Sequence, residues 1–230
     1  MDKPCVDVWT LPLVVSPRDA DAFGAALTAQ EEELLGRIAS APRRERTRVA
    51  WATRRLLLGR ALGCAPADVV IVRPPRGAPT LGMPGQALHF SLSHSADAML
   101  LALSAGARVG ADIEWIDDQV RVDRLARRFF STDEAGEIAS LEPLQARGRF
   151  FQLWTRKEAV LKALGGGVPS RLRTVPLATQ SEQDLLTAAG TLWSLHDVPA
   201  PAGYAAAVAV EGEAVLRIHR QIDDPYDGMG

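Results

Sequence analysis

Three charged side chains fall where the sequence predicts the apolar face of a helix. In Trp154-Thr-Arg-Lys-Glu-Ala-Val-Leu-Lys162, helical spacing places Lys157 and Glu158 inside the apolar half and Lys162 at its edge. That half is formed by Phe150, Leu153, Trp154, Val160, Leu161 and Leu164. Because an unpaired buried charge is strongly unfavourable, the helix predicts an ionic partner. The alternative is an internal Glu158–Lys162 pair, which contributes only ~0.2–0.5 kcal/mol on an exposed face.

A second segment offers that partner. In Arg108-Val-Gly-Ala-Asp-Ile-Glu114, apolar residues alternate with glycine and two acids, which is typical of a strand with one buried face. Asp112 and Glu114 therefore point the same way, and Gly110 beside them is expected to leave room for a ligand. Oxygen ligands without histidine or cysteine suit Mg²⁺, and Mn²⁺ accepts the same set. The alternative is a solvated Asp-x-Glu on an edge strand.

Ser93 and His94 stand at the end of a predicted strand over 88–93. A single histidine is more often structural than functional. A Ser-His pair shortly before two carboxylates nevertheless favours anion binding. A nucleophile and base formed by Ser95 and His94 is disfavoured, because no Gly-x-Ser-x-Gly turn surrounds either serine.

Composition excludes several classes of protein. With 230 residues, 47% of them hydrophobic, the chain can bury a substantial core, and a net charge of −2 argues against a nucleic-acid binder. Cys5 and Cys64 form no metal or disulfide pattern, so a cytoplasmic location is expected. The apolar run 6–15 is interrupted and far below the ~20 residues that span a membrane, so it is read as an opening strand.

The remaining pattern predicts an α+β fold. Helices are expected over 18–38, 43–63, 121–130, 133–141 and 145–164, the fourth after a capping box Ser131-x-x-Glu134. Strands are expected over 69–73, 88–93, 98–104, 108–115, 191–197, 203–210 and 214–219. Helices followed by strands, twice, predict two similar α+β halves, 1–116 and 117–230, with a flexible acidic tail at 221–230. The site is expected in the cleft between the halves.

Three motifs in this order and spacing resemble one known family. Phe90-Ser-Leu-Ser-His-Ser, Val109-Gly-Ala-Asp-Ile-Glu and Trp154-Thr-Arg-Lys-Glu-Ala-Val-Leu-Lys are similar to motifs of the 4′-phosphopantetheinyl transferases of the surfactin-synthetase-activating type. Arg128-Phe-Phe-Ser-x-x-Glu134 matches a further stretch. The resemblance implies a pseudo-twofold monomer that binds coenzyme A between its halves. Such an enzyme transfers the 4′-phosphopantetheine arm to a serine of an acyl or peptidyl carrier protein and releases adenosine 3′,5′-bisphosphate.

The resemblance also implies roles for individual residues. Asp112, Glu114 and Glu158 would hold Mg²⁺, and Glu158 would accept the proton of the carrier serine. Lys162 would contact the pyrophosphate, while Lys157 would either assist the leaving group or anchor the helix. Ser93 and His94 would bind phosphates of coenzyme A, with His94 near the 3′-phosphate.

Two stretches leave the coenzyme A contacts open. Many family members have Gly-Lys-Pro where this chain reads Arg73-Pro-Pro-Arg76-Gly-Ala-Pro79, so the contact near the adenine is lost or is made by Arg73 or Arg76. The basic segment 43–60 allows more than one alignment. Arg44 and Arg48 are the expected partners of the 3′-phosphate, although such a run is more often a solvated face.

A further group of arginines is the expected docking surface for an acidic carrier protein. They recur at helical spacing beside Phe129 and Phe130 and comprise Arg121, Arg124, Arg127 and Arg128. Two other functions remain open: a non-catalytic paralogue that only binds coenzyme A, and another Mg²⁺-dependent phosphoryl-transfer enzyme. The absence of a Gly-x-x-x-x-Gly-Lys-Ser/Thr loop weakens the kinase and ATPase versions of the latter.

Overall fold

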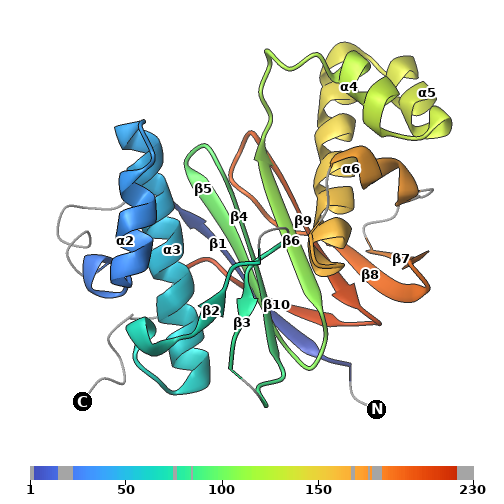
Figure 1. Ribbon diagram of the computed structural model, residues 1–230. Coiled ribbons are helices and arrows are strands. Elements are labelled where there is room, and N and C mark those ends of the chain that lie inside the picture. The colour runs from blue at the N-terminus through green and yellow to red at the C-terminus, as the bar shows by residue number, and fades with distance from the viewer. Residues whose placement is uncertain are drawn as a thin grey trace.

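Two four-stranded sheets form the centre of the protein (Figure 1). The computed structural model describes residues 3–14, 23–74, 77–83, 85–166, 169–175, 177 and 183–221. The first sheet has the order β10 (Val215–His219), β1 (Cys5–Pro12), β5 (Ala98–Ala105) and β4 (Leu88–Ser95). The second has the order β6 (Val109–Trp115), β9 (Tyr204–Glu211), β8 (Thr191–Asp197) and β7 (Gln183–Ala188). A short ribbon of β2 (Ile71–Val72) and β3 (Thr80–Leu81) stands apart.

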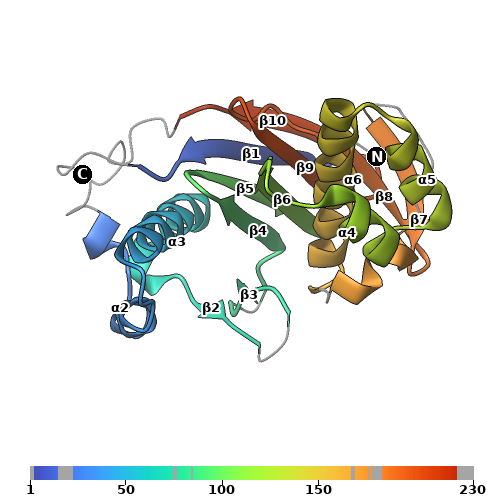
Figure 2. The ribbon, with the colours of Figure 1, turned by 90° about the horizontal axis from the view of Figure 1, so that it is seen from above.

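Helices cover the outer faces of the sheets (Figures 1 and 2). On the side of the first sheet lie α2 (Ala29–Gly36) and α3 (Ala41–Leu62). On the side of the second lie α4 (Val122–Phe129), α5 (Thr132–Ser140) and α6 (Pro143–Ala163). Short 3-10 helices span Pro66–Asp68 and Pro169–Thr174. The prediction of an α+β fold is confirmed.

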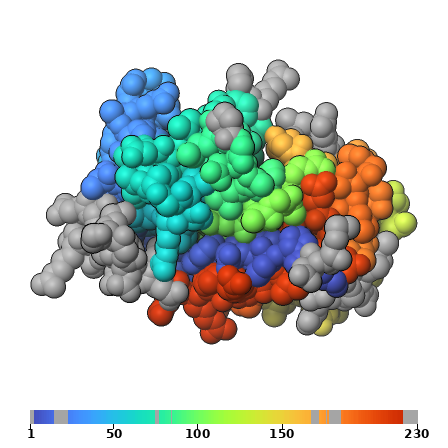
Figure 3. Space-filling view, turned by 90° about the horizontal axis from the view of Figure 1, so that it is seen from below, coloured from blue at the N-terminus to red at the C-terminus, as the bar shows by residue number. Residues whose placement is uncertain are grey.

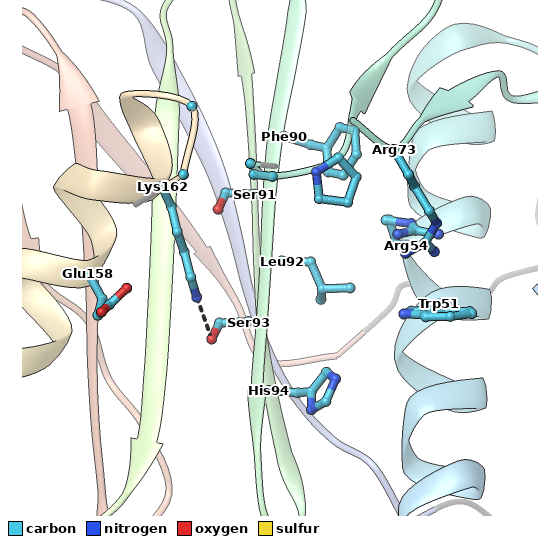
Figure 4. Close-up of a pocket in the computed structure, with 15 residues that line it drawn as sticks. Trp51, Arg54, Arg73, Phe90, Ser91, Leu92, Ser93, His94, Glu158 and Lys162 are labelled. Carbon is cyan, nitrogen blue, oxygen red and sulfur yellow. Dashed lines mark hydrogen bonds between the residues drawn. The ribbon is translucent and has the colours of Figure 1, made fainter. Parts of the chain in front are cut away.

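The two sheets share one apolar core. Val8 of β1, Leu100 of β5, Ile113 of β6 and Val208 of β9 are all fully buried in the same cluster. Because side chains alternate along a strand, the other faces of these sheets meet the helices in two separate clusters. At one corner the edge strands β4 and β6 lie side by side between α3 and α6 (Figure 4). This corner positions the candidate site.

Strand pairing crosses the midpoint of the chain. β6, before residue 116, pairs with β9, whereas β10 returns near the end of the chain to pair with β1. The β1–β10 pair is parallel, while the other ladders within the two sheets are antiparallel. Figure 3 shows β1 and the last strand lying against each other across one face. In the described part of the chain, each sheet therefore contains strands from both sides of residues 116 and 117.

Local chemistry explains the ends of the helices. Ser40 caps α3 and Gly63, with φ 66°, ends it in the left-handed conformation. Ser131 and Glu134 form the predicted capping box of α5. After α6, the backbone of Gly165 adopts φ 100°, which glycine tolerates without the cost of a side chain.

Some predicted elements differ from the structure. The helix expected over 18–38 is broken, because Thr28 forms a capping box with Glu31 and starts α2 at Ala29; residues 18–22 lie outside the described part. The strand expected over 69–73 is shortened to β2, and the sequence pattern missed β3 and β7. Among the described residues, no helix combines the length and apolar character needed to cross a membrane.

Candidate functional site

A cavity of about 1040 Å³ lies between α3 and α6 over β4. Figure 4 shows its walls: Trp51 and Arg54 project from α3, Glu158 and Lys162 from α6, and β4 runs between them. The loops between β2 and β3 and after α6 also contribute. The described lining comprises Trp51, Arg54, Arg73, Gly77, Ala78, Pro79, Phe90, Ser91, Leu92, Ser93, His94, Glu158, Lys162, Gly165 and Gly166.

Lys162 and Asp112 form the ionic contact that the helix required. Lys162 Nζ lies 2.6 Å from Asp112 Oδ1 and donates to Ser93 Oγ at 2.8 Å and to the carbonyl oxygen of Ala111 at 3.1 Å. Ser93 Oγ donates to the same Asp112 oxygen at 2.8 Å. Glu158 takes part in no ion pair among the described residues, so the internal Glu158–Lys162 alternative is not formed. The charge of Lys162 is instead neutralised by Asp112 of β6.

Asp112 is buried, which excludes a solvated carboxylate. Its side chain is 3% exposed, and its Oδ2 has no hydrogen-bond partner among the described residues. A buried acceptor without a donor is unfavourable, and it indicates that a further positive or hydrogen-bonding group belongs there. Asp112 does not itself line the described cavity but reaches it through Lys162 and Ser93.

Glu114 and Glu158 are the other two carboxylates of this corner. Burial, followed by the charges of Asp112 and Glu114, raises the pKa of Glu158 to about 7, although Lys162 acts in the opposite direction. Burial and the charge of Asp112 also raise the pKa of Glu114, while a hydrogen bond from Ser95 and the charge of Lys162 lower it. Two carboxyls whose ionisation is disfavoured by burial and by the charge of Asp112 are suited to a cation or to proton transfer.

Oxygen donors from three carboxylates are the chemistry that Mg²⁺ prefers. The orphaned Oδ2 of Asp112 and the raised pKa values of Glu114 and Glu158 fit such an ion. As they stand, however, the described residues include no group of three or more His, Cys, Asp or Glu side chains that could hold a metal ion. The donor set fits, but the described side chains are not gathered into a finished coordination shell.

The opposite wall of the cavity is aromatic and basic. The guanidinium of Arg73 lies 4.1 Å from the centre of the Trp51 ring. Arg54, with a side chain only 1% exposed, donates to Glu31 at 2.7 Å, and its Nε has no partner among the described residues. Burial is the main reason that the pKa of Arg54 falls to about 10, against the opposing charge of Glu31. This wall can stack against a flat ring and meet an anion.

His94 lines the cavity and is exposed to solvent. Its ring reaches solvent, but desolvation by surrounding atoms, and then the positive charges of Lys162 and Arg43, lower the pKa of its imidazole. An anion bound here would be attracted by the positive charges of Lys162 and Arg43, and it would favour protonation of His94. β4 continues through His94 to Ser95, beyond the strand end expected from the sequence, and Arg43 was not singled out there as a partner of His94.

The structure does not bring Arg44 and Arg48 to the described cavity. Arg44 donates to the carbonyl oxygen of Ile38 at 3.0 Å, and Arg48 pairs with Glu32 and Glu45. Arg54 and Arg73 line it instead. The bulky Trp51 one turn before Arg54 was the signal that this part of the basic helix faces a pocket. Arg76 lies outside the described residues.

Lys157 also lies away from the described lining. Its side chain is fully buried, pairs with Glu134 at 2.8 Å and donates to the carbonyl oxygens of Leu172 and Val175. Glu134 in turn accepts from the backbone N–H groups of Ser131 and Leu177. These contacts favour an anchoring role for Lys157 over assistance to the leaving group. Lys157 ties α6 to α5 and to residues 172–175, which follow α6.

Gly110 has a different role from the one expected. A Cβ at this position would overlap the carbonyl oxygen of Ala159 and the backbone nitrogen of Ala163. Gly110 therefore allows α6 to approach β6 closely, and the prediction that it leaves room for a ligand is wrong. Gly77 has a comparable role, because a Cβ there would collide with the carbonyl oxygen of Gly165 across the cavity wall.

The four arginines expected at a docking surface are all exposed on or beside α4. They comprise Arg121, Arg124, Arg127 and Arg128. Arg128 lies over the ring of Phe129 at 5.0 Å, and the carbonyl oxygen of Arg127 accepts from Arg173. The surface they form is basic and reaches solvent.

Comparisons with known proteins agree on one family. The family model described as 4′-phosphopantetheinyl transferase superfamily matches residues 108–209. The 4′-phosphopantetheinyl transferase HetI of Nostoc sp. is 31% identical over 209 residues, covering 90% of this chain and 88% of that protein. The 4′-phosphopantetheinyl transferase AcpT of Salmonella typhimurium is 37% identical over 158 residues, or 66% of this chain and 80% of that protein. A 4′-phosphopantetheinyl transferase of Bacillus subtilis is 28% identical over 155 residues, 67% of each chain.

Proposed function

The chain belongs to the 4′-phosphopantetheinyl transferase superfamily, whose members move the phosphopantetheine arm from coenzyme A to a carrier protein, and we propose that it does so with Mg²⁺ and a carrier serine as acceptor. The observation that carries this proposal is that Ser93, Lys162 and Glu158 line one large cavity, with Ser93 and Lys162 both bonded to the buried Asp112 behind them. This site combines the positive side chain of Lys162, the acid Asp112 that pairs with it and a candidate base, Glu158. Phosphoryl transfer needs groups of these kinds.

Asp112, Glu114 and Glu158 would hold Mg²⁺, and Mn²⁺ would be accepted by the same oxygens. When bound, the ion would withdraw charge from the pyrophosphate of coenzyme A. The fit rests on the partnerless Oδ2 of Asp112 and on the elevated pKa values of the other two acids.

Glu158 is the proposed general base. Without a bound cation the pKa of Glu158 is about 7, so this carboxyl can take up a proton near neutral pH, and it would accept the proton of the carrier serine directly or through a water. The serine oxygen forms a bond to the phosphorus that bears the pantetheine arm. The bond from that phosphorus to the bridging oxygen breaks, and adenosine 3′,5′-bisphosphate leaves with the electron pair. Lys162 would stabilise the charge that gathers on these oxygens.

The two ends of the cavity suggest how coenzyme A lies in it. The adenine would stack near Trp51 and Arg73, so Arg73 would replace the lysine that many relatives have at position 78. His94, together with Arg43, would meet the 3′-phosphate, and Ser93 and Lys162 would meet the pyrophosphate. Arg54 Nε offers a further donor on the same wall.

Within the superfamily we assign the chain to the surfactin-synthetase-activating type, on the pattern Trp154…Lys157-Glu158-Ala159. The proposed acceptors are acyl or peptidyl carrier proteins of polyketide, nonribosomal peptide or fatty-acid synthesis. The enzyme is proposed to act as a monomer, because its cavity is lined by both halves of one chain. The free thiols of Cys5 and Cys64 fit a cytoplasmic location.

Mass spectrometry of an apo carrier protein tests the proposal. We expect the carrier to gain one phosphopantetheine arm after incubation with the enzyme, coenzyme A and Mg²⁺, and to stay unmodified with EDTA. Binding of coenzyme A without any mass gain on several carriers would favour a non-catalytic paralogue. Hydrolysis of coenzyme A or nucleotides without transfer would favour another phosphoryl-transfer enzyme.

A further inference from the structure

The junction between the two sheets is closed by serine hydroxyls. Ser91 Oγ accepts from the backbone N–H of Ala111 at 3.0 Å, and Ser95 Oγ accepts from that of Trp115 at 3.1 Å. The contacts advance by four residues on both strands, so β4 and β6 run in the same direction. Side chains of β4 thus supply acceptors to β6 where a sheet would use backbone carbonyls.

Ser95 differs from Ser91 in one contact. A hydroxyl carries a single hydrogen, and because the oxygen of Ser95 accepts from Trp115, that hydrogen is free for a second partner. It donates to Glu114 Oε2 at 2.8 Å. Within the described part of the chain, Ser91 contacts no carboxylate. Two serines of one strand therefore make the same junction bond, and only one of them also holds an acid.

Glu114 needs such a restraint. It is half-buried, and it has a long side chain with several rotatable bonds next to the like charge of Asp112. Repulsion would favour rotamers that turn the carboxylate away from Asp112 and Glu158. The bond from Ser95 opposes this rotation. The hydroxyl is itself fixed by the backbone of Trp115, the residue that follows Glu114.

We propose that Ser95 is a positioning residue, whose hydroxyl holds Glu114 on the side of Asp112 and thereby sets the affinity of the site for its divalent cation. The inference rests on the proposed function, because Ser95 acts on the cation only through Glu114, one of the proposed ligands. Groups that orient metal-binding carboxylates typically change metal affinity about 10–100-fold when removed.

The test compares Ser95→Ala with Ser91→Ala, which loses the matching junction bond alone. Binding of Mn²⁺ is measured directly by the electron paramagnetic resonance signal of the free ion, with coenzyme A at a concentration that saturates each variant. We expect Ser95→Ala to weaken Mn²⁺ binding at least about 10-fold. Ser91→Ala and Ser95→Thr, which keeps the hydroxyl, should stay within about 2-fold of wild type.

Kinetics give a second readout. The Ser95→Ala enzyme should need a higher concentration of Mg²⁺ or Mn²⁺ for half-maximal transfer, while kcat at saturating cation recovers most of its wild-type value. If wild type transfers the arm but Ser95→Ala binds Mn²⁺ as well as Ser91→Ala does, the positioning role is wrong and the proposed function stands. A wild-type protein that transfers no arm would overturn both.

Discussion

Lys162 on α6 and Asp112 on β6 are joined by a 2.6 Å contact and share the hydroxyl of Ser93 from β4. Three elements thus meet at one pair of charges at the corner where the sheets join. The pair explains how α6 tolerates a charged group among apolar residues, because the opposite charge is supplied by its neighbouring strand. It also makes Lys162 and Asp112 a unit, whose members should not act independently.

Substitutions at Lys162 and Asp112 should therefore be strongly non-additive. Lys162→Ala should lower turnover and weaken coenzyme A binding, since it removes positive charge from the cavity. Asp112→Asn should abolish most of the transfer. The double variant should be less impaired than the sum of the two losses, with a coupling of about 0.5–3 kcal/mol in kcat/KM. Additivity within about 0.5 kcal/mol would show that the two residues act at separate places.

Glu158→Gln should alter the pH dependence of stability. In the folded protein the pKa of Glu158 is about 7, above its ordinary value, so folding disfavours the ionised form. The folded state binds more protons between the two values, and wild-type stability is lost as pH rises through that window. The variant lacks this loss. In EDTA its melting temperature, relative to wild type, should rise between pH 4.5 and pH 7, by about 2–4 °C for each kcal/mol of wild-type stability lost in that window.

The same variant tests the proposed base. Turnover of Glu158→Gln should fall at least about 10²-fold, because the amide cannot accept the serine proton. An active Glu158→Gln enzyme would show that another group removes the proton. A melting-temperature difference that does not change with pH would refute the environment described for this carboxyl.

Lys157 should prove structural rather than catalytic. Lys157→Met leaves Glu134 buried without its counter-ion and should lower the free energy of unfolding by about 3–5 kcal/mol, measured with urea. Adding Glu134→Gln should recover part of this loss. At a temperature where the variant is folded, kcat should stay within a few fold of wild type. A folded Lys157→Met enzyme with a large loss of kcat would instead place the ammonium in the reaction.

His94 and Arg48 should differ in their effect on the 3′-phosphate. Dephospho-coenzyme A, which lacks that group, should bind wild type more weakly than coenzyme A does. His94→Ala should shrink the difference, because the ring lies at the cavity beside Lys162 and Arg43. Arg48→Ala should preserve it, since Arg48 pairs with Glu32 and Glu45. Calorimetric titrations in which Arg48→Ala loses the discrimination and His94→Ala keeps it would reverse this assignment.

Exposed arginines of α4 should govern the affinity for the carrier. Reversing Arg121 and Arg124 to Glu should raise the KM for an acidic carrier at low ionic strength and leave the KM for coenzyme A unchanged. Arg37→Glu is the control for an exposed charge reversal elsewhere, because Arg37 is also exposed but lies just after α2 beside Glu33. If all three proteins show the same carrier kinetics, docking takes place elsewhere.

The sequence predicted those parts of the protein that depend on local pattern. Hydrophobic periodicity gave most helices and strands, and the Ser131–Glu134 capping box was correctly read. Short elements such as β3 carry too few residues for a period to be visible. The break at Thr28 was missed because the apolar pattern continues across it.

Long-range partners were harder to predict. The charged residues of α6 correctly predicted an ionic partner. Helical periodicity could not show that there are two partners, Glu134 for Lys157 and Asp112 for Lys162. Arg44, Arg48 and Arg54 of α3 belong to one basic run, and apart from the nearby Trp51 nothing in the sequence marks which of them faces the cavity. Gly110 was misread because the approach of α6 to β6 is a tertiary contact.

The stoichiometry of the reaction tests the central claim most directly. Wild-type enzyme, coenzyme A, Mg²⁺ and an apo carrier protein are combined, and holo-carrier and adenosine 3′,5′-bisphosphate are quantified together by mass spectrometry. We expect the two products to form in equal amounts, with EDTA or Glu158→Gln stopping both. Bisphosphate released without holo-carrier, or holo-carrier formed equally well by Glu158→Gln, would contradict the account.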